Sequence, residues 1–105
     1  MANADDLRDP NPWHPITDAV DLKHLGKLGE ECNELGAIIS RAIIQGIDGL
    51  DPETGIPNRV NIEDEIADVL ANIALVEKHF HLDTARMAAR AERKMEHLRK
   101  WHEHA

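Results

Sequence analysis

Apolar residues recur at alternating steps of three and four through the first half of the chain. Between about Thr17 and Gln45 they occupy six positions, Leu25, Leu28, Cys32, Leu35, Ile39 and Ala42. Each residue of an α-helix turns the chain by about 100°, so this spacing gathers the six side chains into one stripe. The pattern predicts a long helix that packs along the stripe.

The same period returns in the second half of the chain, at Ile62, Ile66, Val69, Ile73, Val76 and Phe80. Asn61 followed three residues later by Asp64 resembles a capping box, which predicts that a second helix begins there. Asp83 is the predicted cap of a third helix, which is rich in alanine and runs to about His102. Its basic residues are Arg86, Arg90, Arg93, Lys94, Arg99 and Lys100.

The segments outside these helices are rich in residues that break regular structure. Gly46 and Gly49 end the first helix, and the loop that follows lacks the glycine and glutamate positions of an EF-hand calcium loop. Residues 1–16 contain three prolines and are predicted to form an extended arm, with Trp13 anchoring it on the core. Residues 17–105 then form one all-α domain, a helical hairpin with a third helix.

The size of the chain leaves room for a partner subunit. A single domain of 105 residues buries a core but keeps much of its surface in solvent. Apolar residues such as Ile38, Ile43 and Leu75 flank the predicted stripes, and three helices of one chain do not cover them. We therefore expect two chains to pair into a four-helix bundle, as a homodimer or homotetramer.

Charge and cysteine content exclude several classes of function. Twenty acidic and twelve basic residues give a formal charge of −8, which disfavours binding of a nucleic-acid polymer. Cys32 is the only cysteine, so neither an intrachain disulfide nor a thiolate zinc site is expected, and a reducing cytoplasmic location fits best. The sequence contains neither a secretory signal nor an apolar run that could span a membrane.

Two pairs of carboxylates stand at helical spacing beside the two stripes. Glu31 and Glu34 share a face of the first helix, and Glu65 and Asp68 share a face of the second, which continues to Asn72. Antiparallel packing through the stripes would bring the four carboxylates together, where their mutual repulsion calls for a cation. Ligation by oxygen alone favours magnesium, with manganese as the alternative.

Other interpretations of the same residues stay open at this stage. Acidic residues are common on solvated helix faces, and the helix dipole alone explains Glu63 and Asp64 in a first turn. A di-iron carboxylate bundle is disfavoured, because no glutamate has a histidine three residues later. The histidine pairs at 79/81 and 102/104 are two residues apart and are expected at the surface or in the tail.

The string G-E-E-C-N-E-L around Glu31, followed by D-E-I-A-D-V-L around Glu65, resembles the MazG-like, all-alpha nucleoside triphosphate pyrophosphatase superfamily. The resemblance extends over roughly residues 20–100 and includes the helix order and the basic third helix. It implies that magnesium is held by four residues, Glu31, Glu34, Glu65 and Asp68. It also implies that Glu30 acts as an outer-shell carboxylate or as the base for water, and that Lys94 binds phosphate. Leu98 departs from the family pattern, which often has asparagine there.

The resemblance implies hydrolysis between the α and β phosphates of a nucleoside triphosphate or related nucleotide, giving a monophosphate and pyrophosphate. Lys27 is then a candidate phosphate ligand or simply a salt-bridge partner of Glu31. Asn72 is a candidate contact for ribose or base, or a buried inter-helix hydrogen bond. Trp101 is expected to cap the core rather than to stack on a base. The alternative function is a non-enzymatic acidic helical module for dimerisation or interaction.

Overall fold

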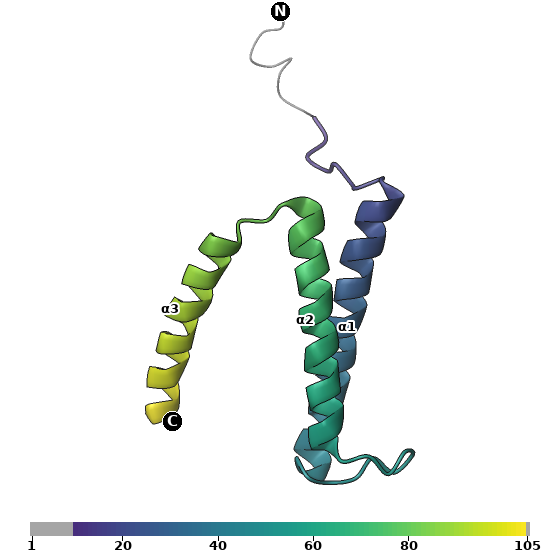
Figure 1. Cartoon of the computed structure of the whole chain (residues 1–105), viewed down its shortest axis with the longest axis vertical. Coiled ribbons are helices and arrows are strands. Elements are labelled where there is room, and N and C mark those ends of the chain that lie inside the picture. The colour runs from purple at the N-terminus through teal and green to yellow at the C-terminus, as the bar shows by residue number, and fades with distance from the viewer. Residues whose placement is uncertain (1–9, 105) are drawn as a thin grey trace, which may run out of the picture.

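Three helices account for most of the chain. The computed structural model describes residues 10–104, so the first nine residues of the predicted arm and Ala105 lie outside the described range. Helix α1 spans Ala19–Gln45, α2 spans Asn58–Phe80 and α3 spans Thr84–Glu103 (Figure 1). Within residues 10–104 there is no strand, only an isolated bridge between Leu50 and Pro57. The predicted all-α fold is confirmed.

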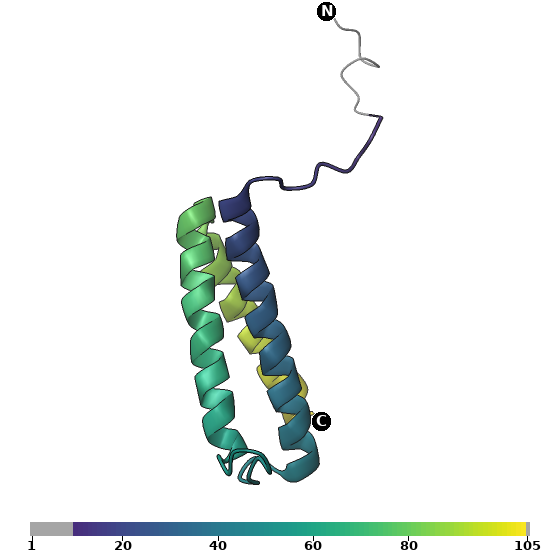
Figure 2. The ribbon, with the colours of Figure 1, turned by 90° about the vertical axis from the view of Figure 1, so that its right-hand side faces the viewer.

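Helices α1 and α2 form an antiparallel hairpin along most of their length (Figure 2). Leu28, Leu35 and Val69 lie half-buried between the two helices, as the apolar periodicity predicted. Val76 is the one apolar side chain that is buried among the described residues. Because apolar burial is the main stabilising contribution to folding, a hairpin with so small a core is expected to gain stability from further packing.

The stripe positions that stay exposed lie, with the flanking Ile43, to one side of the contact between the helices. We call this side, formed by Leu25, Cys32, Ile39, Ile43 and Ile66, the apolar face; all five residues are exposed. The opposite side, the acidic face, carries Lys27, Glu30, Glu34, Asp64 and Asp68. Each residue turns a helix by about 100°, so the side chains of the apolar face and those of the acidic face fall on opposite sides of the line along which the two helices touch.

The connection between the helices is fixed by Asn58, whose side chain is fully buried. The amide Nδ2 of Asn58 donates to Gln45 Oε1 at 3.0 Å and to the Gly46 carbonyl at 3.1 Å, and so joins the end of α1 to the start of α2. Helix α2 therefore begins at Asn58, with Pro57 as N-cap, and the predicted start at Asn61 is wrong. Asn61 lies inside the helix because the loop hydrogen bonds start it one turn earlier.

Helix α3 stands apart from the hairpin, and every one of its residues is exposed (Figure 1). Its predicted cap is confirmed, since Asp83 accepts a hydrogen bond from the Arg86 amide at 2.9 Å. The chain leaves α2 through His81, whose φ of 51° is left-handed. The expected packing of Trp101 on the core is wrong within one chain, because α3 stands apart from the hairpin over most of its length and Trp101 is 63% exposed.

Residues 10–18, which precede α1, run away from the hairpin (Figure 2), and Trp13 among them is 78% exposed. Trp13 therefore does not anchor the segment on the core, contrary to the prediction. Helix α1 begins at Ala19 because Asp18 caps it, accepting hydrogen bonds from the amides of Val20 and Asp21. No helix within residues 10–104 has the length and apolar character that crossing a membrane requires.

Candidate metal centre

Three carboxylates from the two hairpin helices meet near the middle of the hairpin. Glu31 of α1 and Glu65 and Asp68 of α2 each present an oxygen within 4.8 Å of the others. Glu31 is buried, at 7% exposure, while Glu65 is half-buried and Asp68 is exposed. The antiparallel arrangement of the two helices produces this meeting, since Glu31 lies midway along α1 and the other two lie midway along α2.

Two oxygens of this cluster are buried without a hydrogen-bond partner. They are Glu31 Oε2 and Glu65 Oε2, one from each helix. Leaving a buried carboxylate oxygen without a partner costs free energy, which a bound cation or a proton would recover. The other oxygen of Glu31 lies 3.2 Å from the Lys27 ammonium, so the carboxylate is only partly neutralised.

The charges of the cluster disturb one another. Burial raises the pKa of Glu65, and the charges of Glu34, Glu31 and Asp68 raise it further. The charge of Glu31 likewise raises the pKa of Glu34. Hydrogen bonds to Glu31 and Glu30 raise the pKa of Lys27, the one cation in contact with these acids among the described residues. Like charges therefore outnumber the local counter-charge, and a bound cation would relieve this repulsion.

The structure brings together three of the four predicted ligands and leaves Glu34 at their edge. Glu34 is exposed and lies outside the group whose oxygens are within 4.8 Å of one another, although it is close enough for Glu31 and Glu65 to interact with it electrostatically. Glu30 is also exposed, with its carboxylate 3.4 Å from Lys27. Lys27 itself forms the predicted salt bridge to Glu31.

The other two predicted site residues are Asn72 and Lys94. Within one chain, no described contact joins either of them to the carboxylate cluster. The Asn72 amide donates to the carbonyl of Asp68 at 2.8 Å, a bond within α2 that differs from the predicted inter-helix bond. Lys94 lies on α3, which stands apart. Together with Arg90, Arg93 and His97 it lines a cavity of about 270 Å³, which we call the basic groove.

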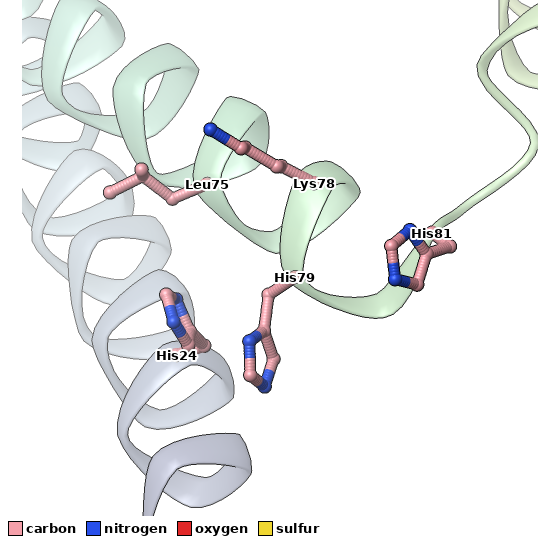
Figure 3. A pocket seen from close by; sticks show the side chains of 5 residues that line it. All are labelled: His24, Leu75, Lys78, His79 and His81. Atoms are coloured by element: carbon pink, nitrogen blue, oxygen red, sulfur yellow. The ribbon is translucent and has the colours of Figure 1, made fainter.

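A second constellation lies at the open end of the hairpin, and the sequence interpretation missed it. His79 Nε2 lies 2.6 Å from Asp21 Oδ1, and the His79 ring stacks on His24 with centroids 4.2 Å apart. These histidines border a cavity of about 360 Å³ with Leu75, Lys78 and His81 (Figure 3). His79 is thus half-buried, contrary to the predicted surface position. Only the pairing register of α1 with α2 could have revealed it, because Asp21 and His79 are 58 residues apart.

The resemblance to the MazG-like superfamily rests on the spacing of the acidic residues in two helices and on the order of the helices. The fold adds that three of these acids meet, whereas the proposed phosphate-binding lysine lies elsewhere in the same chain. Comparison of the chain with protein-family models, with curated proteins and with solved structures finds no significant match.

Proposed function

We propose that the chain is a magnesium-dependent nucleotide pyrophosphohydrolase, which cleaves a nucleoside triphosphate or related nucleotide to a monophosphate and pyrophosphate. The observation that carries the proposal is the meeting of Glu31, Glu65 and Asp68, with one buried, unpartnered oxygen on each of the two glutamates. A solvated acidic face would not need to bury such oxygens. The lone cysteine favours a cytoplasmic location for the enzyme.

The donors of the cluster match magnesium better than softer metals. All three residues offer carboxylate oxygens, and no histidine or cysteine joins them among the described residues. Glu34, one turn beyond Glu31, is the proposed fourth ligand. Bound magnesium would neutralise the phosphate oxygens and make a bound water more acidic. Manganese, which accepts similar ligands, is the expected substitute.

The remaining residues of the site have proposed roles that follow from their positions. Glu30 is exposed at the edge of the cluster, where its carboxylate can accept a proton from the attacking water or orient it through an outer-shell contact. Lys27 partly neutralises Glu31, and it would be available to a phosphate oxygen if a cation held that carboxylate. Asn72, one turn beyond Asp68, is the proposed contact for the ribose or base.

We also propose that the enzyme is a homodimer or homotetramer built on a four-helix bundle. The apolar face supports this assembly, since exposed apolar side chains of both hairpin helices gather on one side. Ile43, at the end of α1, is among the most exposed apolar side chains of the described residues, at 79%. Two hairpins that pack through their apolar faces would cover most of the side chains of these faces.

The test is pyrophosphate release from canonical, deoxy and damaged nucleotides, with magnesium varied against a chelator. We expect release that requires magnesium or manganese and that Glu65→Gln abolishes. Glu63→Gln is the matched control, because Glu63 is an exposed acid two residues away on α2 and outside the cluster. Absence of metal-stimulated release from every nucleotide would leave the alternative, a helical interaction module whose acidic surface binds a basic partner.

A further inference from the structure

We propose that α3 acts on a second copy of the chain, lying on the acidic face of the partner's hairpin and presenting its basic groove to the partner's carboxylate cluster. The purpose of this contact, phosphate binding beside the metal, rests on the proposed function. The contact itself does not, because it follows from the packing needs and charges of α3 and the hairpin.

Helix α3 needs a packing partner that its own chain does not supply. It has 20 residues and none is buried, whereas helices in proteins owe most of their stability to the packing of an apolar face. Its helical register gathers Met87, Ala91 and Leu98 into a narrow apolar stripe, and the basic groove runs along one edge of that stripe. A helix of this kind is stable when the stripe is covered, and the groove then lies at the border of the contact.

The charges of α3 complement those of the hairpin. Helix α3 carries six arginine and lysine residues and three glutamates, whereas α1 and α2 together carry nine acidic and five basic residues. The imbalance is local as well. The basic groove has four basic side chains on one side of α3, and the acidic face has only Lys27 against its carboxylates in the described contacts. Complementary faces of this kind orient and select a partner.

The arrangement of the helices favours a partner copy over the same chain. Figures 1 and 2 place α3 beyond one broad side of its own hairpin, separated from it. Because α-helices are right-handed, the register of α1 in Figure 2 turns the apolar face away from the viewer, toward α3. If a second hairpin packs its apolar face on the apolar face of the first, it lies between the first hairpin and the first copy's α3. The acidic face of the second hairpin then points toward that α3.

The cluster and the basic groove also lie at matching heights. Lys94 is ten residues into α3, about 15 Å from its start at a rise of about 1.5 Å per residue. Asp68 lies twelve residues before the end of α2, about 18 Å below the same joint. Both positions are near the middle of the hairpin's length. A two-fold axis along the hairpin keeps each position at its height, and one across the middle of the hairpin moves each by only a small distance along it. Either axis can therefore bring Lys94 of one copy level with Asp68 of the other.

The exposed area of the chain is large enough for such an assembly. The accessible surface is 8742 Å², against roughly 5,900 Å² for a compact monomer of this mass. The exposed residues 10–18 contribute part of the excess, and the uncovered sides of the three helices contribute a further part. Permanent dimers bury about 1,000 to 2,500 Å² on each partner, which is comparable with the excess.

Cross-linking tests the contact without relying on activity. One copy carries Cys32→Ala and Ala71→Cys, which places a thiol on the acidic face one turn beyond Asp68, and the other carries Cys32→Ala and His97→Cys in the basic groove. After mixing and treatment with a short bismaleimide, we expect a covalent product of the two copies. The control Glu92→Cys lies on the far side of α3 and should give little product.

Two outcomes of the same experiment would overturn the proposal. One is equal cross-linking from His97→Cys and Glu92→Cys. The other comes from a variant that carries both thiols on one chain and is diluted into an excess of chain without cysteine. A predominantly intrachain product would then show that α3 folds onto its own hairpin, whereas the proposal expects that product to fall to the background.

Complementation adds the functional consequence. Asp68→Asn removes a carboxylate and Lys94→Ala removes a cation, so each variant should be inactive alone. When the two variants exchange subunits at random, half of the dimers are mixed, and each mixed dimer has one complete site out of two. The mixture should therefore recover about a quarter of the wild-type rate. If the wild type is active and the mixture stays inactive, α3 does not complete the partner's site. If the wild type is itself inactive, the proposed function fails and the cross-linking result still decides where α3 packs.

Discussion

His79 Nε2 lies 2.6 Å from Asp21 Oδ1 and joins the last turn of α2 to the first turn of α1. The His79 ring also stacks on His24 and meets Phe80 edge-on. The opposite end of the hairpin is held by the buried amide of Asn58. Polar contacts therefore fasten both ends of a hairpin whose apolar core is small, and the carboxylate cluster lies between them.

Replacing His79 should loosen the open end of the hairpin. We expect His79→Ala to lower the free energy of unfolding by about 1 kcal/mol, because it removes one partly buried hydrogen bond and two ring contacts. Chemical denaturation followed by circular dichroism measures the change. His81→Ala is the control, since His81 borders the same cavity but is exposed. Equal losses from both variants would mean that the Asp21 contact contributes nothing specific.

The raised pKa values of Glu65 and Glu34 predict an unusual pH dependence for the metal-free chain. An acid whose pKa is higher in the folded than in the unfolded state favours folding while it is protonated. The contribution of these two groups to stability should therefore be greatest below the ordinary glutamate value of 4.5 and should fall as the pH rises through the raised values. Thermal unfolding with a chelator, from about pH 4 to pH 8, measures this slope.

Glu65→Gln should flatten that slope, because it removes the group with the buried carboxylate. Asp48 provides a control of opposite sign. A hydrogen bond from Arg59 lowers the pKa of Asp48, so its contribution to stability is present above its unfolded pKa and is lost as the pH falls through the lowered value. Asp48→Asn should therefore change only the acid end of the profile. An unchanged slope in Glu65→Gln would argue against mutual repulsion within the cluster.

Removing one carboxylate of the proposed site should separate activity from stability. We expect Glu34→Ala or Asp68→Ala to lower turnover by at least about a hundredfold. The metal-free chain should keep its helical signal and its melting temperature, or melt slightly higher, because like-charge repulsion is relieved. Magnesium should raise the melting temperature of the wild type but not that of the variants. Unfolding of either variant would assign these acids a structural role instead.

Helix positions could be predicted from the sequence because they depend on local periodicity. The apolar period located the first two helices, and it placed Leu28, Leu35 and Val69 correctly between α1 and α2; the Asp83 cap and the alanine-rich composition located the third helix. The same period could not show that Leu25 and Ile39 stay exposed, because a stripe of this width borders both the contact line and the free side of a helix. What covers the free side depends on other chains.

The candidate site was predictable to the extent that it follows from spacing within a helix. Glu65 and Asp68 face the same way for local reasons, and antiparallel pairing then brings Glu31 to them. The fully buried state of Asn58 and the contact of His79 with Asp21 depend on the height at which the two helices pair. The length and hydrogen bonds of the loop set that height, and no periodicity in the sequence encodes it.

The loop that sets the pairing height can be tested at Gly49. A Cβ atom at this position would lie 2.3 Å from the carbonyl oxygen of Gln45, and a backbone atom of a helix end cannot move aside without disturbing its neighbours. The Gly49 carbonyl also accepts a hydrogen bond from the backbone N–H of Asn58 at 2.9 Å, so a shift of the loop would disturb the start of α2. We expect Gly49→Ala to destabilise the chain by about 1 to 3 kcal/mol.

Gly26→Ala is the matched control within α1, where a Cβ meets nothing within 4 Å, and it should instead stabilise the helix by about 0.5 to 1 kcal/mol. Denaturation midpoints of the two variants should therefore move in opposite directions, and a Gly49→Ala variant as stable as the wild type would show that the loop does not determine how the helices pair.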